Sequence, residues 1–416
     1  MKKKLLAFLL TAALAAGLCP AAAFAAPANG DGLMAAQVET PLNAAAVADP
    51  TCMLVDKAGN LWQCTSAGAP VSMVWEKYSA FYDQKSIVKK IFVAADVATY
   101  NRQAKYSYKL SSGNVSSTTQ LLNNGFSKVT ELHFLTGANG LSACRTLPAD
   151  AFSNWSNLQT IVNFDKTQVA SIAKNQFSYT GLRSIVLPKA CKTVSTYAFS
   201  SCASLTSVDA SKSQVTSIGT YAFSRCTALK TVSLPATLKT LNNYAFNGCS
   251  KLTAVKNLNK TRIATVKKGA FYGCAALKSI ALPNTCKTLG DDAFWDCKKL
   301  SKITLGSKTT TVGAWAFRNC KSLKSIVLPA TCKKVGSFAF SNCSSLKKVT
   351  MKSKSVVRNA KKASYYMDDV FFKTPIAKKK GGTARIYVPK SVLSKYKSKS
   401  YSNKWHYISP SRFRGI

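Results

Sequence analysis

Residues 311–328 read TVGAWAFRNCKSLKSIVL, and variants of this phrase recur about every 23 residues along the chain. The shared pattern is an apolar residue, then Ala-Phe, then Cys three residues after the Phe and Leu three residues further on. The Phe of each clear copy is Phe199, Phe223, Phe246, Phe271, Phe294, Phe317 or Phe340, and degenerate copies precede them at Phe152 and Phe177. A fixed period of roughly 20 to 30 residues is typical of a solenoid, because one unit cannot bury its apolar face alone.

The positions within one unit divide by their physical role. Ile326 and Leu328 are two residues apart, as in a short strand with one face toward a core. An apolar residue also stands five positions before the Phe in all nine copies: Leu147, Ile172, Val194, Ile218, Leu241, Val266, Leu289, Val312 and Val335. Such regular retention predicts stacked columns of Phe, Leu and Val or Ile side chains.

The phrase Ala-Phe-x-x-Cys-x-x-Leu-x-x-Ile-x-Leu-Pro closely resembles the repeats of the BspA-like leucine-rich-repeat bacterial surface proteins, over residues 145–351. The resemblance implies a repeat solenoid, a leucine-rich-repeat-like right-handed coil with short parallel strands, about nine units of ~23 residues and caps at both ends. It also implies an exported protein, since members are typically associated with adhesion, host-protein binding or surface display. The many Lys, Ser and Thr residues at variable positions depart from the family.

The N-terminus predicts export. Lys2, Lys3 and Lys4 precede an apolar run that ends at Leu18, and small residues follow near Ala25, which is the pattern of a secretory signal peptide. The run is shorter than the roughly 20 residues that a membrane span needs, so we expect no transmembrane span in the mature chain. Secretion or display at the cell surface is therefore the expected localisation.

The remaining sequence divides by composition. The expected segments are the signal peptide at 1–25, a flexible linker at 26–50, an N-terminal cap with degenerate repeats at 51–144, the leucine-rich-repeat solenoid at 145–351 and a basic C-terminal cap at 352–416. Residues 54–62 predict a hairpin that turns around residues 56–60. We interpret the N-terminal part as a cap because a solenoid end would otherwise expose strand edges; a separate small catalytic domain is the alternative.

The 14 cysteines follow the repeat rather than a disulfide pattern. Seven stand three residues after the Phe and form one expected column: Cys202, Cys226, Cys249, Cys274, Cys297, Cys320 and Cys343. Cys191, Cys286 and Cys332 occupy a position where another unit has Leu238, which indicates a small buried hydrophobic side chain. We predict free structural thiols, with Cys52 and Cys64 across the hairpin as a possible disulfide. The sequence contains no paired Cys-x-x-Cys sets of the kind that bind a metal ion.

Residues that carry catalysis are sparse. The two histidines are His133 in a strand-like run and His406 in the aromatic tail. The adjacent carboxylates Asp291-Asp292 and Asp368-Asp369 are typical of solvated turns. Acid–base or zinc chemistry needs histidines and carboxylates that converge, so we expect no enzyme activity, no catalytic residues and no cofactor.

Charge is the feature that indicates a function. The chain has 58 Lys and Arg against 16 Asp and Glu, a formal net charge of +42. One expected row of ligand-binding lysines lies four residues after each Leu-Pro proline (Lys192, Lys239, Lys287, Lys333), and a second follows the conserved Leu (Lys230, Lys278, Lys324, Lys347). Aligned cations repel one another, and an anionic polymer relieves that repulsion. The alternative for each single lysine is a solvated surface that confers solubility.

Two functions are consistent with these features. The first is an exported adhesin or binding protein whose basic surface holds an anionic cell-wall polymer, a glycan or a host matrix protein. The second is a structural, wall-associated protein with no host ligand, retained at the envelope by its charge. Specific nucleic-acid recognition is not expected, since no nucleic-acid-binding motif is visible.

Overall fold

The computed structural model describes residues 129–134, 144, 145, 147, 149–355, 370–377, 383–398 and 408–416, together with short strands between residues 52 and 114 and at 358–359. The chain divides into two compact units. The first comprises Met1–Pro148 and Thr160–Val169, and the second comprises Ala149–Gln159 and Ala170–Ile416. The predicted signal peptide and linker lie outside the described residues.

The first unit contains a six-stranded sheet in the order β3-β2-β1-β4-β7-β8. Its strands are β1 (Cys52–Val55), β2 (Leu61–Ser66), β3 (Met73–Lys77), β4 (Lys90–Val93), β7 (Glu131–Phe134) and β8 (Thr160–Val162); β5 (Lys109–Leu110) and β6 (Gly113–Asn114) form a separate pair. The hairpin predicted around residues 56–60 is confirmed, because β1 and β2 pair antiparallel with Val55 opposite Leu61. The β1-β4, β4-β7 and β7-β8 pairs are parallel.

The second unit contains a nine-stranded parallel sheet made of two-residue strands. These are β9 (Ser171–Ile172), β11 (Thr193–Val194), β13 (Ser217–Ile218), β15 (Thr240–Leu241), β17 (Thr265–Val266), β19 (Thr288–Leu289), β21 (Thr311–Val312), β23 (Lys334–Val335) and β25 (Arg358–Asn359). From β9 to β23 the second residue is the conserved apolar residue and is buried. The first residue, usually Thr or Ser, faces outward, as the two-residue period of a strand requires.

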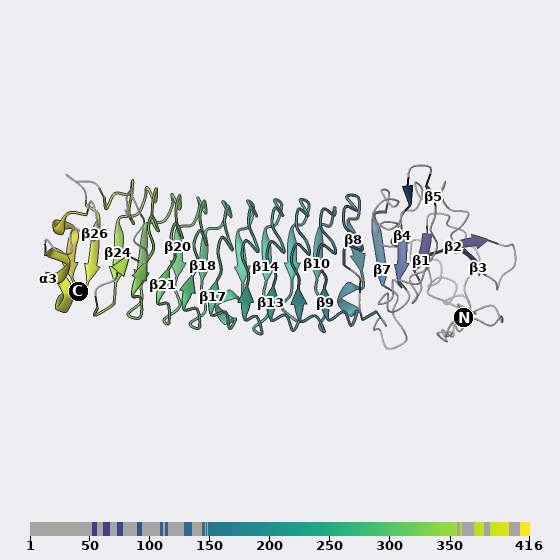
Figure 1. Ribbon diagram of the computed structural model, residues 1–416, viewed down its shortest axis with the longest axis horizontal. Coiled ribbons are helices and arrows are strands. Elements are labelled where there is room, and N and C mark those ends of the chain that lie inside the picture. The colour runs from purple at the N-terminus through teal and green to yellow at the C-terminus, as the bar shows by residue number, and fades with distance from the viewer. Residues whose placement is uncertain are drawn as a thin grey trace, which may run out of the picture. The chain divides into compact units, whose positions relative to one another are not determined.

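A second series of parallel strands follows the conserved Leu of each coil. It comprises β10 (Ser184–Val186), β12 (Ser207–Asp209), β14 (Thr231–Ser233), β16 (Ala254–Lys256), β18 (Ser279–Ala281), β20 (Lys302–Thr304), β22 (Ser325–Leu328), β24 (Lys348–Met351), β26 (Arg385–Val388) and β27 (Phe413–Gly415). Figure 1 shows the coils of this unit stacked in chain order from β10 to β26. The predicted solenoid of about nine parallel-strand coils of ~23 residues is thereby confirmed.

A column of phenylalanine rings forms the centre of the second unit. Neighbouring rings from Phe152 to Phe371 stack with centroids 5.2 to 5.5 Å apart. The backbone supports the same spacing, since the amide of Phe223 donates to the carbonyl of Ala245 in the next coil at 2.8 Å. Phe371 is a member that the period did not predict, because it lies 31 residues after Phe340 instead of about 23.

Each complete coil turns at two residues with left-handed backbone, two positions before and two positions after its Phe. In one coil these are Trp315, with φ of 51°, and Asn319, with φ of 61°. Glycine serves the same purpose elsewhere, as at Gly269 with φ of 58°. Coils also approach closely at Gly336, where an added Cβ would lie 2.3 Å from the backbone nitrogen of Ala314.

Helices are few and short in the described residues. The 3₁₀ turns η3 (Phe164–Lys166) and η4 (Leu258–Lys260) follow β8 and β16, and η5 (Pro410–Arg412) precedes β27. The helix α3 (Lys390–Lys397) covers the C-terminal end of the second unit, where Tyr396 stacks on Phe413 at 5.0 Å. None of the described helices is long and apolar enough to cross a lipid bilayer.

Candidate functional site

The first lysine row consists of Lys192, Lys239, Lys287 and Lys333, all exposed on the second unit. Backbone hydrogen bonds give the register: the amide of Lys239 donates to the carbonyl of Thr216, and the amide of Thr216 donates to the carbonyl of Lys192, each at 2.8 Å. Thr216 thus occupies the same position in the intervening coil. The row therefore has one lysine in every second coil, at a spacing of about 10 Å if two strand separations lie between them.

The second lysine row consists of Lys230, Lys278, Lys324 and Lys347, also exposed. Hydroxyl residues separate its members: Thr253 donates through Oγ1 to the carbonyl of Lys230 at 3.1 Å, and Ser301 donates in the same way to Lys278. Lys324 and Lys347 lie in consecutive coils, and Ala384 holds the equivalent position in the next coil, where Arg385 pairs with Lys348. The density of positive charge therefore rises toward the C-terminal end.

The two rows lie beside different strand series. Lys192 directly precedes β11, whereas Lys230 directly precedes β14. The structure aligns the members of each row along the coils but does not merge the rows into one site. Within the described part of the chain, none of the eight lysines forms a salt bridge, so their positive charges are not neutralised by neighbouring carboxylates.

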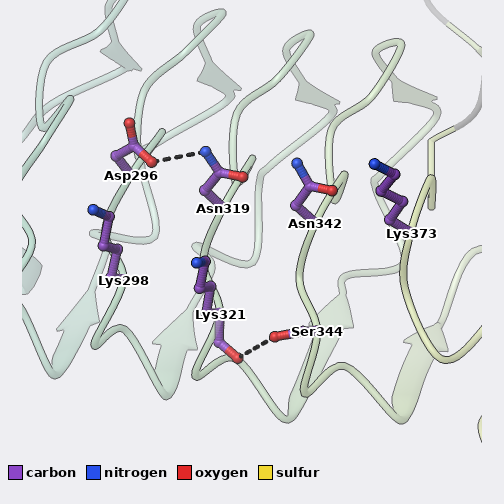
Figure 2. Close-up of a pocket in the computed structure, with 7 residues that line it drawn as sticks. All are labelled: Asp296, Lys298, Asn319, Lys321, Asn342, Ser344 and Lys373. Carbon is purple, nitrogen blue, oxygen red and sulfur yellow. Dashed lines mark hydrogen bonds between the residues drawn. The ribbon is translucent and has the colours of Figure 1, made fainter.

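A polar groove that the sequence did not predict crosses the C-terminal coils. It has a volume of about 420 Å³ and is lined by Asp296, Lys298, Asn319, Lys321, Asn342, Ser344 and Lys373. Figure 2 shows two rows of side chains running side by side: Asp296, Asn319, Asn342 and Lys373 in one, and Lys298, Lys321 and Ser344 in the other. Three lysines against one aspartate make the groove cationic.

Backbone geometry positions the groove row that begins at Asp296. Asp296, Asn319, Asn342 and Lys373 all have left-handed φ, between 54° and 61°, and each occupies the turn two residues after a core Phe. The Nδ2 of Asn319 donates to Oδ1 of Asp296 at 2.8 Å. Asn and Asp tolerate this conformation better than other non-glycine residues. The arrangement offers amide donors and acceptors beside ammonium groups, which suits a hydroxylated anionic ligand.

The catalytic candidates do not converge. His133 Nε2 contacts Oε2 of Glu131 at 2.7 Å, and His133 is buried in β7. In the second unit, Asp291 accepts a hydrogen bond from the backbone amide of Ala314, and Asp292 pairs with Lys268 at 3.8 Å. These are turn interactions of the coils. His406, Asp368 and Asp369 lie outside the described residues, and the described residues contain no cluster suited to hold a metal ion.

The seven cysteines three residues after the core Phe form a hydrogen-bonded column. Each Sγ donates to the carbonyl of the Phe in the preceding coil at 3.0 to 3.2 Å, as from Cys249 to Phe223. All eleven cysteines from Cys144 to Cys343 are buried, and the ten from Cys191 to Cys343 are free thiols. Burial raises the pKa of the Cys274 thiol well above its usual value, because a thiolate would be desolvated there.

Eleven buried thiols are expected to resist alkylation in the native state. At pH 8 the cysteines from Cys144 to Cys343 should remain unmodified by iodoacetamide, because all of them are buried and the reagent cannot reach their Sγ atoms in the folded chain. Mass spectrometry with and without urea measures this directly. All eleven should react once the chain is unfolded. Rapid native modification of several core cysteines would contradict the packing described here.

The predicted Cys52–Cys64 disulfide stays a prediction. The register of β1 and β2 pairs Met53 with Gln63, and Cys52 and Cys64 are the next residues beyond this pair. Their side chains lie outside the described residues.

Stacked coils with two short parallel strands each, a Leu after each core Phe from Phe152 to Phe340 and an aligned Cys column define a leucine-rich-repeat solenoid. Residues 170–265 and 255–366 match the family model described as "BspA type Leucine rich repeat region", with six copies. Residues 170–366 are therefore a BspA-type leucine-rich-repeat region. No curated protein matches its sequence.

Several solved structures are similar to the chain. A leucine-rich repeat protein from Bacteroides ovatus is 22% identical, with 70% of this chain and 84% of that chain covered and a TM-score of 0.32. A leucine rich cell surface protein from Faecalibacterium prausnitzii is 18% identical, with 74% and 83% covered and a TM-score of 0.36. The pneumococcal vaccine antigen PcpA is 14% identical, with 79% and 78% covered and a TM-score of 0.33.

Proposed function

We propose that this protein is an exported, non-enzymatic surface protein that binds acidic polymers, such as an anionic cell-wall polymer, a glycan or an acidic host matrix protein. The observation that carries the proposal is the alignment of exposed, unneutralised lysines along the solenoid. A linear polyanion laid along the coils meets a lysine at every second coil, so its charges and those of the protein are matched over a long contact. The predicted signal peptide supports a location where such polymers occur.

Replacing the first lysine row is expected to weaken polyanion binding about thirtyfold, because each of its four lysines loses an exposed ion pair worth ~0.5 kcal/mol. The variant changes Lys192, Lys239, Lys287 and Lys333 to Gln, and titration with dextran sulfate measures the dissociation constant. Neutral dextran should not bind either protein. Raising the salt concentration should weaken wild-type binding more steeply than variant binding, because surface charges are screened.

A matched variant separates alignment from net charge. Changing the exposed residues Lys174, Lys251, Lys299 and Lys395 to Gln removes the same charge but leaves the first lysine row intact. This control should lose only a few-fold in affinity. Equal losses in both variants would show that total charge, not the row, holds the polymer. A surface fraction without affinity for host mucin or matrix would favour the alternative of a structural wall protein.

A further inference from the structure

An aromatic ridge runs beside the polar groove on the second unit. We define it as Tyr272, Trp295, Trp315, Phe338 and Phe372, all partly exposed. Successive ring centroids lie 5.3, 6.4, 6.3 and 6.2 Å apart, so the ridge is continuous over five coils. These rings are separate from the buried column of core Phe residues, and each of the five residues is partly exposed to solvent.

The backbone at part of the ridge is unfavourable for the residues it carries. Trp315 and Phe338 have left-handed φ of 51° and 55°, a conformation that bulky residues rarely adopt. The equivalent positions of the two preceding coils hold Gly269 and Asp292, residue types that tolerate it better. Neither the core nor the turn requires an aromatic ring there. Strained residues that persist at an exposed surface are an indication of function.

The ridge and the groove form one continuous surface. Trp295 directly precedes Asp296 of the groove, and Phe372 directly precedes Lys373. Nζ of Lys373 lies 5.4 Å from the centroid of the Phe372 ring, so a groove cation contacts a ridge ring. Figure 2 shows the groove residues in order along successive coils, from Asp296 to Lys373. The coils of Phe294, Phe317, Phe340 and Phe371 each carry both a groove residue and a ridge residue.

Some buried polar atoms in the coils that carry the ridge lack hydrogen-bond partners. Among the described residues, Oδ1 of Asp292, Nε1 of Trp295 and Nε of Arg318 are buried without a partner. The guanidinium of Arg318 covers the Trp295 ring at 4.6 Å. A displaced Arg318 side chain would uncover the Trp295 ring. The three buried atoms comprise donors and an acceptor, and hydroxyl groups can satisfy both kinds.

We propose that the ridge and the groove together bind an acidic polysaccharide that lies along the coil axis. The sugar rings pack on the aromatic edges, the sugar hydroxyls bond to Asp296, Asn319 and Asn342, and the carboxylates pair with Lys298, Lys321 and Lys373. This inference rests on the proposed function and adds to it a ligand class and a second site, whose lysines belong to neither lysine row. An acidic peptide matches the lysines equally well, but the amide row and the aromatic ridge favour a hydroxylated, ring-containing polymer.

The test compares polygalacturonate with poly-L-glutamate that has the same number of carboxylates per chain, each titrated against the full mature protein. Wild type should bind polygalacturonate at least about tenfold more tightly. Changing Trp315 and Phe338 to Ala should remove about tenfold in polygalacturonate affinity and leave poly-L-glutamate binding unchanged, since ring contacts are lost and charges are kept. Thermal unfolding of each variant establishes that it is folded.

Two further variants make the result specific. The first variant changes Lys298, Lys321 and Lys373 to Gln. It leaves the core intact and should also lower polygalacturonate affinity about tenfold. Tyr221→Ala is the matched control, because Tyr221 is an aromatic residue at the same left-handed position, in a separate stack with Tyr197 and Tyr244. It should bind polygalacturonate as wild type does.

The outcomes separate this inference from the proposed function. If both polymers bind with equal affinity and the Trp315 and Phe338 variant behaves as wild type, the polysaccharide site is wrong while the lysine-row function stands. If neither polymer nor dextran sulfate binds, both are wrong. If poly-L-glutamate binds more tightly and depends on the ridge, the ligand is an acidic peptide and the inference is overturned.

Discussion

Replacing Phe246 by Ala is expected to lower the free energy of unfolding by about 3 to 5 kcal/mol. The side chain is fully buried, and its ring stacks between Phe223 at 5.3 Å and Phe271 at 5.5 Å. Its removal leaves a cavity that the neighbouring coils cannot close, because their backbones are hydrogen-bonded in fixed register. Urea denaturation followed by circular dichroism measures the change.

The position of Phe246 within the stack should also change the cooperativity of unfolding. Each coil of a solenoid contacts only its neighbours, so a weak coil in the middle uncouples the two sides. We therefore expect a broader urea transition, with a smaller apparent m-value, in addition to a lower midpoint. Tyr221→Ala is the control, since its ring is similarly stacked but partly exposed, and its loss should cost about 1 kcal/mol. Equal destabilisation by both variants would contradict the conclusion that the buried ring of Phe246 stabilises the fold more than an exposed stacked ring does.

Stability is expected to fall as the pH rises from 9 to 11. Burial raises the pKa of Cys191 and of Cys332 from 9.0 to about 11. Below pH 9 both thiols are protonated in the folded and unfolded chains, so the full stability is present. Between pH 9 and pH 11 the unfolded chain releases protons that the folded chain retains, which favours unfolding by on the order of 2 kcal/mol for each thiol.

The free energy of unfolding at pH 8, 9.5 and 10.5 tests this sign. The control changes Cys191 and Cys332 to Val, a residue that the chain already carries at the equivalent buried position, Val215. The double variant should lose less stability over the same interval than the wild type. Lysine deprotonation acts equally in both proteins and cancels in the comparison. Identical pH profiles would exclude a contribution from these thiols.

Much of the fold was predictable because buried positions obey the period. The core Phe, the Leu that follows and the apolar residue before them recur at fixed spacing, since each must enter the same column. The same logic predicted that Cys202 and its equivalents lie in one column. It did not reveal that their thiols donate to Phe carbonyls of the preceding coil. Phe371 was missed because the chain between it and Phe340 is longer than one period.

The sequence by itself determined the solenoid, the core columns and which lysines share a position in the repeat. Only the tertiary structure decided which exposed residues come together as surfaces: the polar groove and the aromatic ridge. The exposed turn positions recur in every coil but their residue types do not, since the position of Trp315 holds Gly269 or Asp292 in nearby coils. These turn residues align along the coils because they share a left-handed backbone conformation. Their residue types differ so much that the sequence shows no repeated pattern at these positions.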